Sequence, residues 1–94
     1  MLYKDALGEV IRQTRKNRNL TMRDISDAGY ISLGYLSEVE RGRKEIASAF
    51  LDIVAQALGV NAYDLVIEAG YRMAESTIPD TVEKIDEYSD LMVS

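Results

Sequence analysis

The sequence predicts an all-α fold of five helices, with one further helix near the C-terminus. Apolar residues recur at intervals of three and four, which places them on one face of a helix. Residues that favour helix N-caps stand before most of these stretches. The 94 residues include a single proline and six glycines, so helices are favoured over short strands. A core of this size is marginal alone, and a second subunit would add stability.

The first helix is predicted over residues 4–18. Leu7, Val10 and Ile11 lie on its apolar face, because they recur with the helical period. The polar run at 17–19 ends it.

A second, short helix is predicted over residues 22–28. Thr21 caps its start, and Asp24 stands three residues later, as in a capping box. Gly29 is expected to end the helix, because glycine readily adopts the left-handed conformation. Its apolar positions are Met22, Ile25 and Ala28.

The third helix is predicted over residues 32–41, with Ser32 as its cap and Gly42 after its end. A basic loop, 41–44, follows it. The apolar face is formed by Leu33, Leu36 and Val39.

Two more helices are predicted before residue 70. Ser48 caps one, which ends at Gly59, and Asn61 caps the other, which ends at Gly70. Their apolar positions are Phe50, Leu51, Val54, Ala55, Leu58, Leu65, Val66 and Ala69. Tyr63 is expected in the core, like Phe50.

Three regions follow from this pattern. Residues 1–70 form the main domain, 71–79 a linker with the only proline, and 80–94 a C-terminal helix and tail. The last segment is either a disordered acidic tail or a dimerisation arm, and we favour the arm. Its apolar stripe consists of Val82, Ile85, Tyr88 and Met92.

The helices at 22–28 and 32–41 form a helix-turn-helix pattern. Gly29 lies in the tight turn between them, and apolar residues are spaced to lock the pair from inside. In such a unit the second helix enters the major groove of DNA. The pattern therefore predicts a DNA-binding domain.

The amino-acid sequence of these segments closely resembles that of one family. Residues 20–26 (LTMRDIS), 29–32 (GYIS), 36–44 (LSEVERGRK) and 51–60 (LDIVAQALGV) resemble the Cro/C1-type (XRE) helix-turn-helix family over about residues 7–69. The resemblance implies a five-helix, lambda-repressor-like DNA-binding domain. It also implies a transcription regulator that binds double-stranded DNA at a palindromic operator, as a homodimer, through helix 32–41.

Within this family, residues 35–42 (YLSEVERG) are similar to an actinobacterial regulator of Clp protease genes. This likeness implies an activator of protease and chaperone (clp-type) genes. It also raises contact with RNA polymerase and turnover by Clp protease as possibilities. Asp24 and Asp27 are expected to be solubilising, with an activating patch for the polymerase as the alternative.

The resemblance also implies roles for individual residues. Leu33 could contact a thymine methyl group, and Glu38 could accept a hydrogen bond from cytosine. The expected base contacts are Leu33, Gly34, Tyr35 and Glu38. The expected phosphate contacts are Thr21, Arg23, Ser32, Ser37, Arg41, Arg43 and Lys44.

Arg15 and Glu40 are expected to form the ion pair with which this family ties its first helix to its third. Removing one partner of a buried pair costs several kcal/mol. The alternative is two exposed charges worth under ~1 kcal/mol.

The charge is divided unevenly along the chain. Residues 1–47 hold nine Lys and Arg against seven acidic residues, and residues 48–94 hold two against nine. Phosphates attract basic surfaces, so the front half is the expected DNA-binding part despite the net charge of -5.

The composition excludes several other functions. Without Cys or His, the chain can form neither disulfides nor Cys/His zinc sites, and no cofactor or metal is expected. The usual nucleophile and base arrangements of enzymes are also missing. No apolar run reaches the ~20 residues of a membrane span, and no signal peptide is recognised, which fits a cytoplasmic protein. The remaining alternative is an antitoxin or adaptor that uses the same fold to bind protein.

Overall fold

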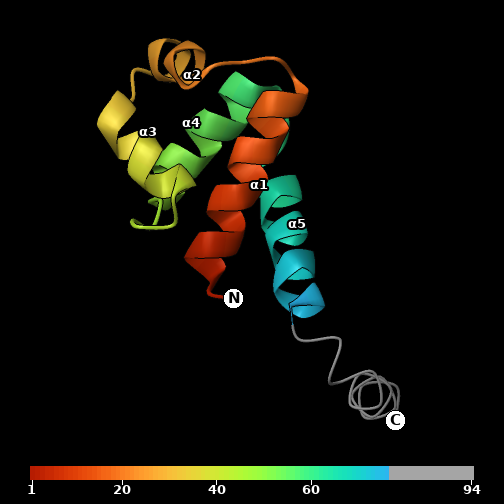
Figure 1. Ribbon diagram of the computed structural model, residues 1–94. Helices are drawn as coiled ribbons and strands as arrows, with labels where there is room; N and C mark the ends of the chain where they lie inside the picture. Colours follow the sequence, from red (N-terminus) through yellow and green to blue (C-terminus); the bar gives the residue numbers. More distant parts are fainter. Residues whose placement is uncertain (77–94) are drawn as a thin grey trace, which may run out of the picture.

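The computed structural model describes residues 1–76, which fold into five helices and their connecting loops (Figure 1). The helices are α1 (Tyr3–Asn17), α2 (Met22–Gly29), α3 (Leu33–Glu40), α4 (Ser48–Leu58) and α5 (Ala62–Glu75). The predicted all-α, five-helix fold is confirmed. The predicted C-terminal helix, with Val82, Ile85, Tyr88 and Met92, lies outside the described residues.

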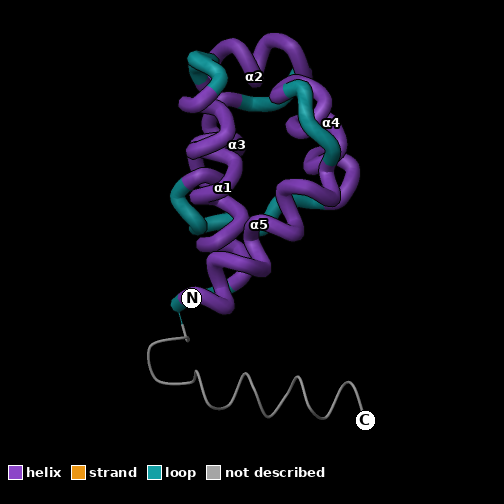
Figure 2. The backbone as a smooth tube through the Cα atoms, turned by 90° about the vertical axis from the view of Figure 1, so that its right-hand side faces the viewer, coloured by secondary structure: helices purple, strands orange, loops and turns teal. Residues whose placement is uncertain are grey.

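Helix α1 is the central element of the bundle. It packs against both α3 and α5, while α4 packs against α2 and α5. In Figure 1, α1 runs between α3 and α5, and Figure 2 shows α2 crossing the end of the bundle in the perpendicular view. Helix α3 is thus held by α1 on one side and by α2 on another.

The core contains most of the predicted apolar positions. Its buried side chains come from every helix and from the turn before α3: Ala6, Leu7, Val10, Ile11, Ile25, Ile31, Leu36, Val39, Val54, Ala55, Leu58, Leu65 and Ala69. Five of the predicted apolar positions are exposed instead of buried: Ala28, Leu33, Phe50, Tyr63 and Val66. Phe50 still contacts the Tyr35 ring of α3 from the surface.

The start of α2 follows the prediction. Thr21 Oγ1 accepts a hydrogen bond from the Asp24 N–H at 3.0 Å, and Asp24 Oδ2 accepts one from the Thr21 N–H at 2.8 Å. This reciprocal capping box satisfies two N–H groups. The hydrogen bond from the Thr21 backbone N–H lowers the pKa of Asp24 below its usual value.

The end of α2 differs from the prediction. Gly29 remains helical, and Tyr30 adopts the left-handed conformation at φ 53°. The absence of a side chain at Gly29 serves packing, since a Cβ there would lie 2.7 Å from Ile53 Cγ2 of α4. The glycine therefore allows α2 to approach α4, and the tyrosine makes the turn.

Two helix ends in the second half also differ. The N-cap of α4 is Ala47, without a side-chain hydrogen bond, so Ser48 is not the cap. Asn61 occupies the N-cap of α5 as predicted, but its amide donates to Tyr63 Oη and Asp64 Oδ2 instead of accepting from the backbone. Helix α5 continues through Gly70 to Glu75, so the first part of the predicted linker is helical.

No single helix within residues 1–76 has the length and apolar character of a membrane span. Only α4 and α5 taken together reach that length and composition, and they are bent by 101° at their junction.

Gly8 brings α1 close to the end of α3. A Cβ at this position would clash with the Val39 carbonyl oxygen and lie 2.9 Å from that of Glu40. Both neighbours are backbone atoms, which cannot rotate away. Gly8 therefore sets how closely the two helices approach.

A paired substitution tests this close approach. Gly8→Ala is expected to lower the free energy of unfolding by about 1–3 kcal/mol, because overpacking forces the helices apart. Gly34→Ala is the control with the same chemical change, since the nearest atom to the added Cβ is Ser32 Oγ at 3.7 Å, an ordinary contact distance. It should raise the stability by up to ~1 kcal/mol through helix propensity. Urea unfolding followed by circular dichroism measures both, and equal effects would contradict the close approach.

Candidate nucleic-acid interface

Helix α3 presents one face to solvent and the other to the core. Ser32 Oγ accepts a hydrogen bond from the Tyr35 N–H at 3.3 Å and so caps the helix, as predicted. Leu36 and Val39 are buried. The outer face carries Leu33, Gly34, Ser37, Glu38 and, just after the helix, Arg41; Ser37 and Glu38 are half-buried and the others exposed. Three of the four predicted base-contact residues therefore lie together on this face.

Tyr35, the fourth, supports the following loop. Its hydroxyl oxygen accepts a hydrogen bond from the Ala47 N–H at 3.1 Å and lies 3.5 Å from the Glu45 carbonyl oxygen. The ring centroid lies 5.3 Å from that of Phe50. The sequence did not predict this bracing role, because it depends on residues 10–15 positions away along the chain.

The basic loop after α3 is held by backbone hydrogen bonds. The Arg43 N–H donates to the Glu38 carbonyl oxygen at 2.9 Å, and the Gly42 N–H donates to that of Val39 at 3.0 Å. Gly42 has φ 74° and is buried beside Asp5. The side chains of Arg41, Arg43 and Lys44 remain exposed.

The other predicted phosphate contacts, Thr21, Arg23 and Ser32, lie at the starts of α2 and α3. Arg23, on the first turn of α2, is exposed. Thr21 and Ser32 are exposed as well, but each uses its hydroxyl oxygen to cap a helix. Their hydroxyl hydrogens are still available to a phosphate.

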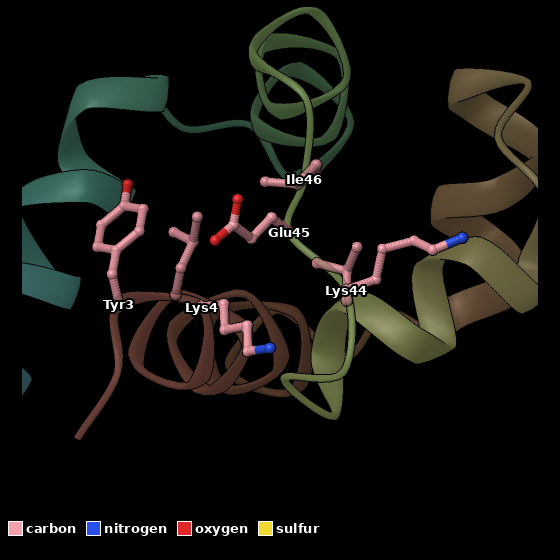
Figure 3. Close-up of a pocket in the computed structure, with 7 residues that line it drawn as sticks. Tyr3, Lys4, Lys44, Glu45 and Ile46 are labelled. Atoms are coloured by element: carbon pink, nitrogen blue, oxygen red, sulfur yellow. The ribbon is translucent and has the colours of Figure 1, made fainter.

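A small cavity of about 120 Å³ lies beneath the loop, beside the start of α1. In Figure 3 the Glu45 side chain extends toward Tyr3, whereas Lys44 extends in the opposite direction. The Lys44 Nζ atom lies 5.5 Å from the Tyr35 ring centroid, a cation–π distance. Lys44 is thereby directed toward α3 and away from the cavity.

Arg15 and Glu40 form a bidentate pair between α1 and the last residue of α3. Arg15 Nε donates to Glu40 Oε2 at 2.8 Å, and Nη2 donates to Oε1 at 3.0 Å. Arg15 Nη1 also donates to the Leu20 carbonyl oxygen at 2.9 Å. The side chains are only 11% and 4% exposed. The predicted pair is present, and its hydrogen bonds raise the pKa of Arg15 above its usual value.

The arrangement suits binding of a polyanion more than a chemical reaction. Within residues 1–76 no group of acidic side chains could hold a metal ion. Arg12 and Lys16 of α1, which were not predicted as contacts, line a groove with Arg41. Their spacing of four residues on one helix was the signal that could have indicated them.

Comparison with known proteins assigns the chain to a family. Residues 11–65 match the family described as Helix-turn-helix. The transcriptional regulator ClgR of Mycobacterium tuberculosis is 44% identical over 73 residues, which are 78% of this chain and 65% of that regulator. The chain thus spans slightly less than two thirds of this relative.

Solved structures give the same result. The clp gene regulator ClgR from Corynebacterium glutamicum superposes with a TM-score of 0.80 at 39% identity, over 95% of each chain. The restriction-modification controller protein C.Esp1396I, solved as a tetramer with its natural 35 base-pair operator, has a TM-score of 0.66 at 18% identity. That match covers 73% of this chain and 95% of the controller, and it shows a shared fold. The relatives named here are regulators, not enzymes.

The Arg15–Glu40 pair is open to a double-mutant cycle. Arg15→Met or Glu40→Leu alone is expected to cost about 3 kcal/mol of unfolding free energy, because each leaves a buried charge without its partner. The double variant should recover most of that loss, since two apolar side chains replace both charges. Urea unfolding of the four proteins gives the coupling energy. A coupling below ~1 kcal/mol, typical of an exposed pair, would refute a structural role.

Proposed function

The chain belongs to the XRE type of the helix-turn-helix family, and we propose that it regulates transcription by binding specific sites in double-stranded DNA. The observation that carries this proposal is the exposed face of α3, fixed from behind by Arg15–Glu40 and followed by exposed cations. A helix presented in this way fits the major groove.

Base recognition and backbone contact fall to different residues in this proposal. Glu38 accepts a hydrogen bond from cytosine N4, and Leu33 contacts a thymine methyl group. Gly34 lets the helix approach the bases closely. Arg23, Arg41, Arg43 and Lys44 contact phosphates, which fix position and affinity but carry little sequence information.

The proposal for the regulated genes rests on the names of the relatives. Two proteins with high identity to this chain are named as ClgR, one of them as a clp gene regulator. We propose that this chain likewise controls clp-type protease and chaperone genes in the cytoplasm, as an activator. Asp24 and Asp27 are exposed, and their expected role is to keep the protein soluble; a contact with RNA polymerase is the alternative role for this pair. Turnover by the Clp protease would then limit the abundance of the regulator itself.

We propose a homodimer as the DNA-binding form, because two modules on a palindrome bind more tightly than one. An apolar stripe along α5 supports it: Tyr63 (63% exposed), Ile67 (50%) and Tyr71 (60%) recur every four residues. Val66 lies beside the stripe, and nothing lies within 4 Å of a Cβ at Gly70, so a second helix can pack closely. The predicted arm at 80–94, with Val82, Ile85, Tyr88 and Met92, remains a second candidate for the dimer surface.

Two substitutions test the DNA-binding proposal. Arg43→Ala is expected to weaken binding to all sequences alike and to reduce the salt slope by about 1. Glu38→Ala should relax the base preference at one position of the site. Selection from a random DNA pool identifies the site, and fluorescence anisotropy at several salt concentrations gives the affinities. Glu68→Ala, on α5, is the matched control. A wild-type protein that selects no sequence and shows no salt dependence would overturn the proposal in favour of a protein-binding adaptor.

A charge placed in the α5 stripe tests the dimer. Ile67→Glu is expected to convert the dimer into a 10.5 kDa monomer, because an apolar interface cannot accommodate an unpaired carboxylate. Light scattering after size-exclusion chromatography measures the mass, and Gln56→Glu on α4 is the control. Removal of residues 77–94 separates the two surfaces. A dimer lost only on truncation would assign the interface to the arm alone.

A further inference from the structure

A groove between α1 and the end of α3 contains a second group of cations, separate from Arg43 and Lys44. Its volume is about 290 Å³. Four basic side chains and one acidic side chain line it together with a hydroxyl group: Arg12, Arg15, Lys16, Glu40, Ser37 and Arg41. Such a concentration of positive charge is unusual on a chain whose net charge is -5.

Only part of this charge is neutralised inside the protein. Glu40 is occupied by Arg15, and this is the single ion pair among residues 1–76. Arg12, Lys16 and Arg41 are exposed and have no carboxylate partner in that part of the chain. The groove therefore has a local charge of about +3. A charge of this sign favours an anion over a cation in the groove.

Arg15 also lines the groove, but its guanidinium group is already engaged in hydrogen bonds within the protein. Its Nε and Nη2 atoms donate to Glu40, and its Nη1 atom donates to the Leu20 carbonyl oxygen. The three other cations are not fixed in this way. Any anion in the groove would be held by Arg12, Lys16 and Arg41.

The groove opens onto the outer face of α3. Ser37 and Arg41 are one helical turn apart, and Leu33 precedes Ser37 by another turn, so all three lie on the same side of the helix. When that side enters the major groove of DNA, a sugar–phosphate strand runs along the edge of the helix. The anion that meets this groove is then a backbone phosphate.

We propose, on the basis of the DNA-binding function above, that this groove binds one phosphate of duplex DNA through Arg12, Lys16 and Arg41. Guanidinium groups donate two hydrogen bonds to a phosphate, and the lysine adds a point charge. The Ser37 hydroxyl donates a further bond. The volume corresponds to several water molecules at about 30 Å³ each, which is room for a phosphate group. Helix α1 thus contributes directly to affinity.

A second hollow continues the cationic surface along α1. It has a volume of about 270 Å³, shares Arg12 and Lys16 with the first, and adds Arg72 of α5. Glu9 and Gln13 also line it, so its positive charge is weaker. The phosphate is therefore assigned to the groove beside α3.

The experiment compares the 94-residue chain with the variants Arg12→Gln, Lys16→Gln and their double variant. Fluorescence anisotropy gives the affinity for a selected duplex and for an unrelated duplex. Repeating it from about 50 to about 300 mM salt gives the dependence of the affinity on salt concentration. Each single change is expected to reduce the salt slope by about 0.9 and to weaken binding about fivefold on both duplexes. The control is Arg18→Gln, which removes the same charge from an exposed residue beside Gly59.

The outcomes separate this inference from the proposed function. Wild-type binding that is steeply salt dependent, with the double variant indistinguishable from Arg18→Gln, would overturn the phosphate site and leave DNA binding intact. No DNA binding by the wild type would overturn both. A titration with inorganic phosphate at constant ionic strength, followed by the Arg side-chain NMR signals, tests the other source of the same chemistry. Phosphate binding that the double variant loses, without any change in its DNA affinity, would assign the groove to a free anion.

Discussion

The buried ion pair between Arg15 and Glu40 is the constraint on which the rest of the interface depends. A carboxylate that is 4% exposed is stable in its charged form only with a well-placed partner. The two parallel hydrogen bonds to the guanidinium permit few relative positions of α1 and α3. Gly8 removes the side chain that would keep the helices apart. The outer face of α3 is thereby fixed from the inside of the domain.

The angle between α2 and α3 has a different cause. Tyr30 makes the turn in a left-handed conformation although its side chain is 96% exposed and gains nothing from packing. Such a conformation costs a non-glycine residue about 1–2 kcal/mol. Gly29 remains the last residue of α2, where a Cβ would lie 2.7 Å from Ile53 Cγ2 of α4. The packing of α2 against α4 therefore outweighs the conformational cost at Tyr30, and this packing determines where α3 begins.

Features that depend on nearby residues were predictable from the sequence. Helix periodicity gave the positions of all five helices, and the capping box of Thr21 and Asp24 and the cap at Ser32 are present as predicted. Errors arose where a distant element decides the outcome. Phe50 packs beside the Tyr35 ring at the surface, and Gly70 lies within a helix that α1 supports along its length. The Arg15–Glu40 pair, 25 residues apart, was predictable only through the family resemblance.

The distance dependence of electrostatic interactions bears on how an acidic chain can bind DNA. Charges farther apart than about 10 Å are largely screened in physiological salt. The described acidic residues of the second half, Asp52, Asp64, Glu68 and Glu75, belong to α4 and α5, not to α3 or the basic loop. In the proposed complex the chain would approach DNA with the side that carries α3. In the proposed complex, Leu33, Gly34 and Glu38 would offer the bases few hydrogen-bond donors, which would leave affinity to the cations and selectivity to Glu38, apolar contact and the deformability of the DNA.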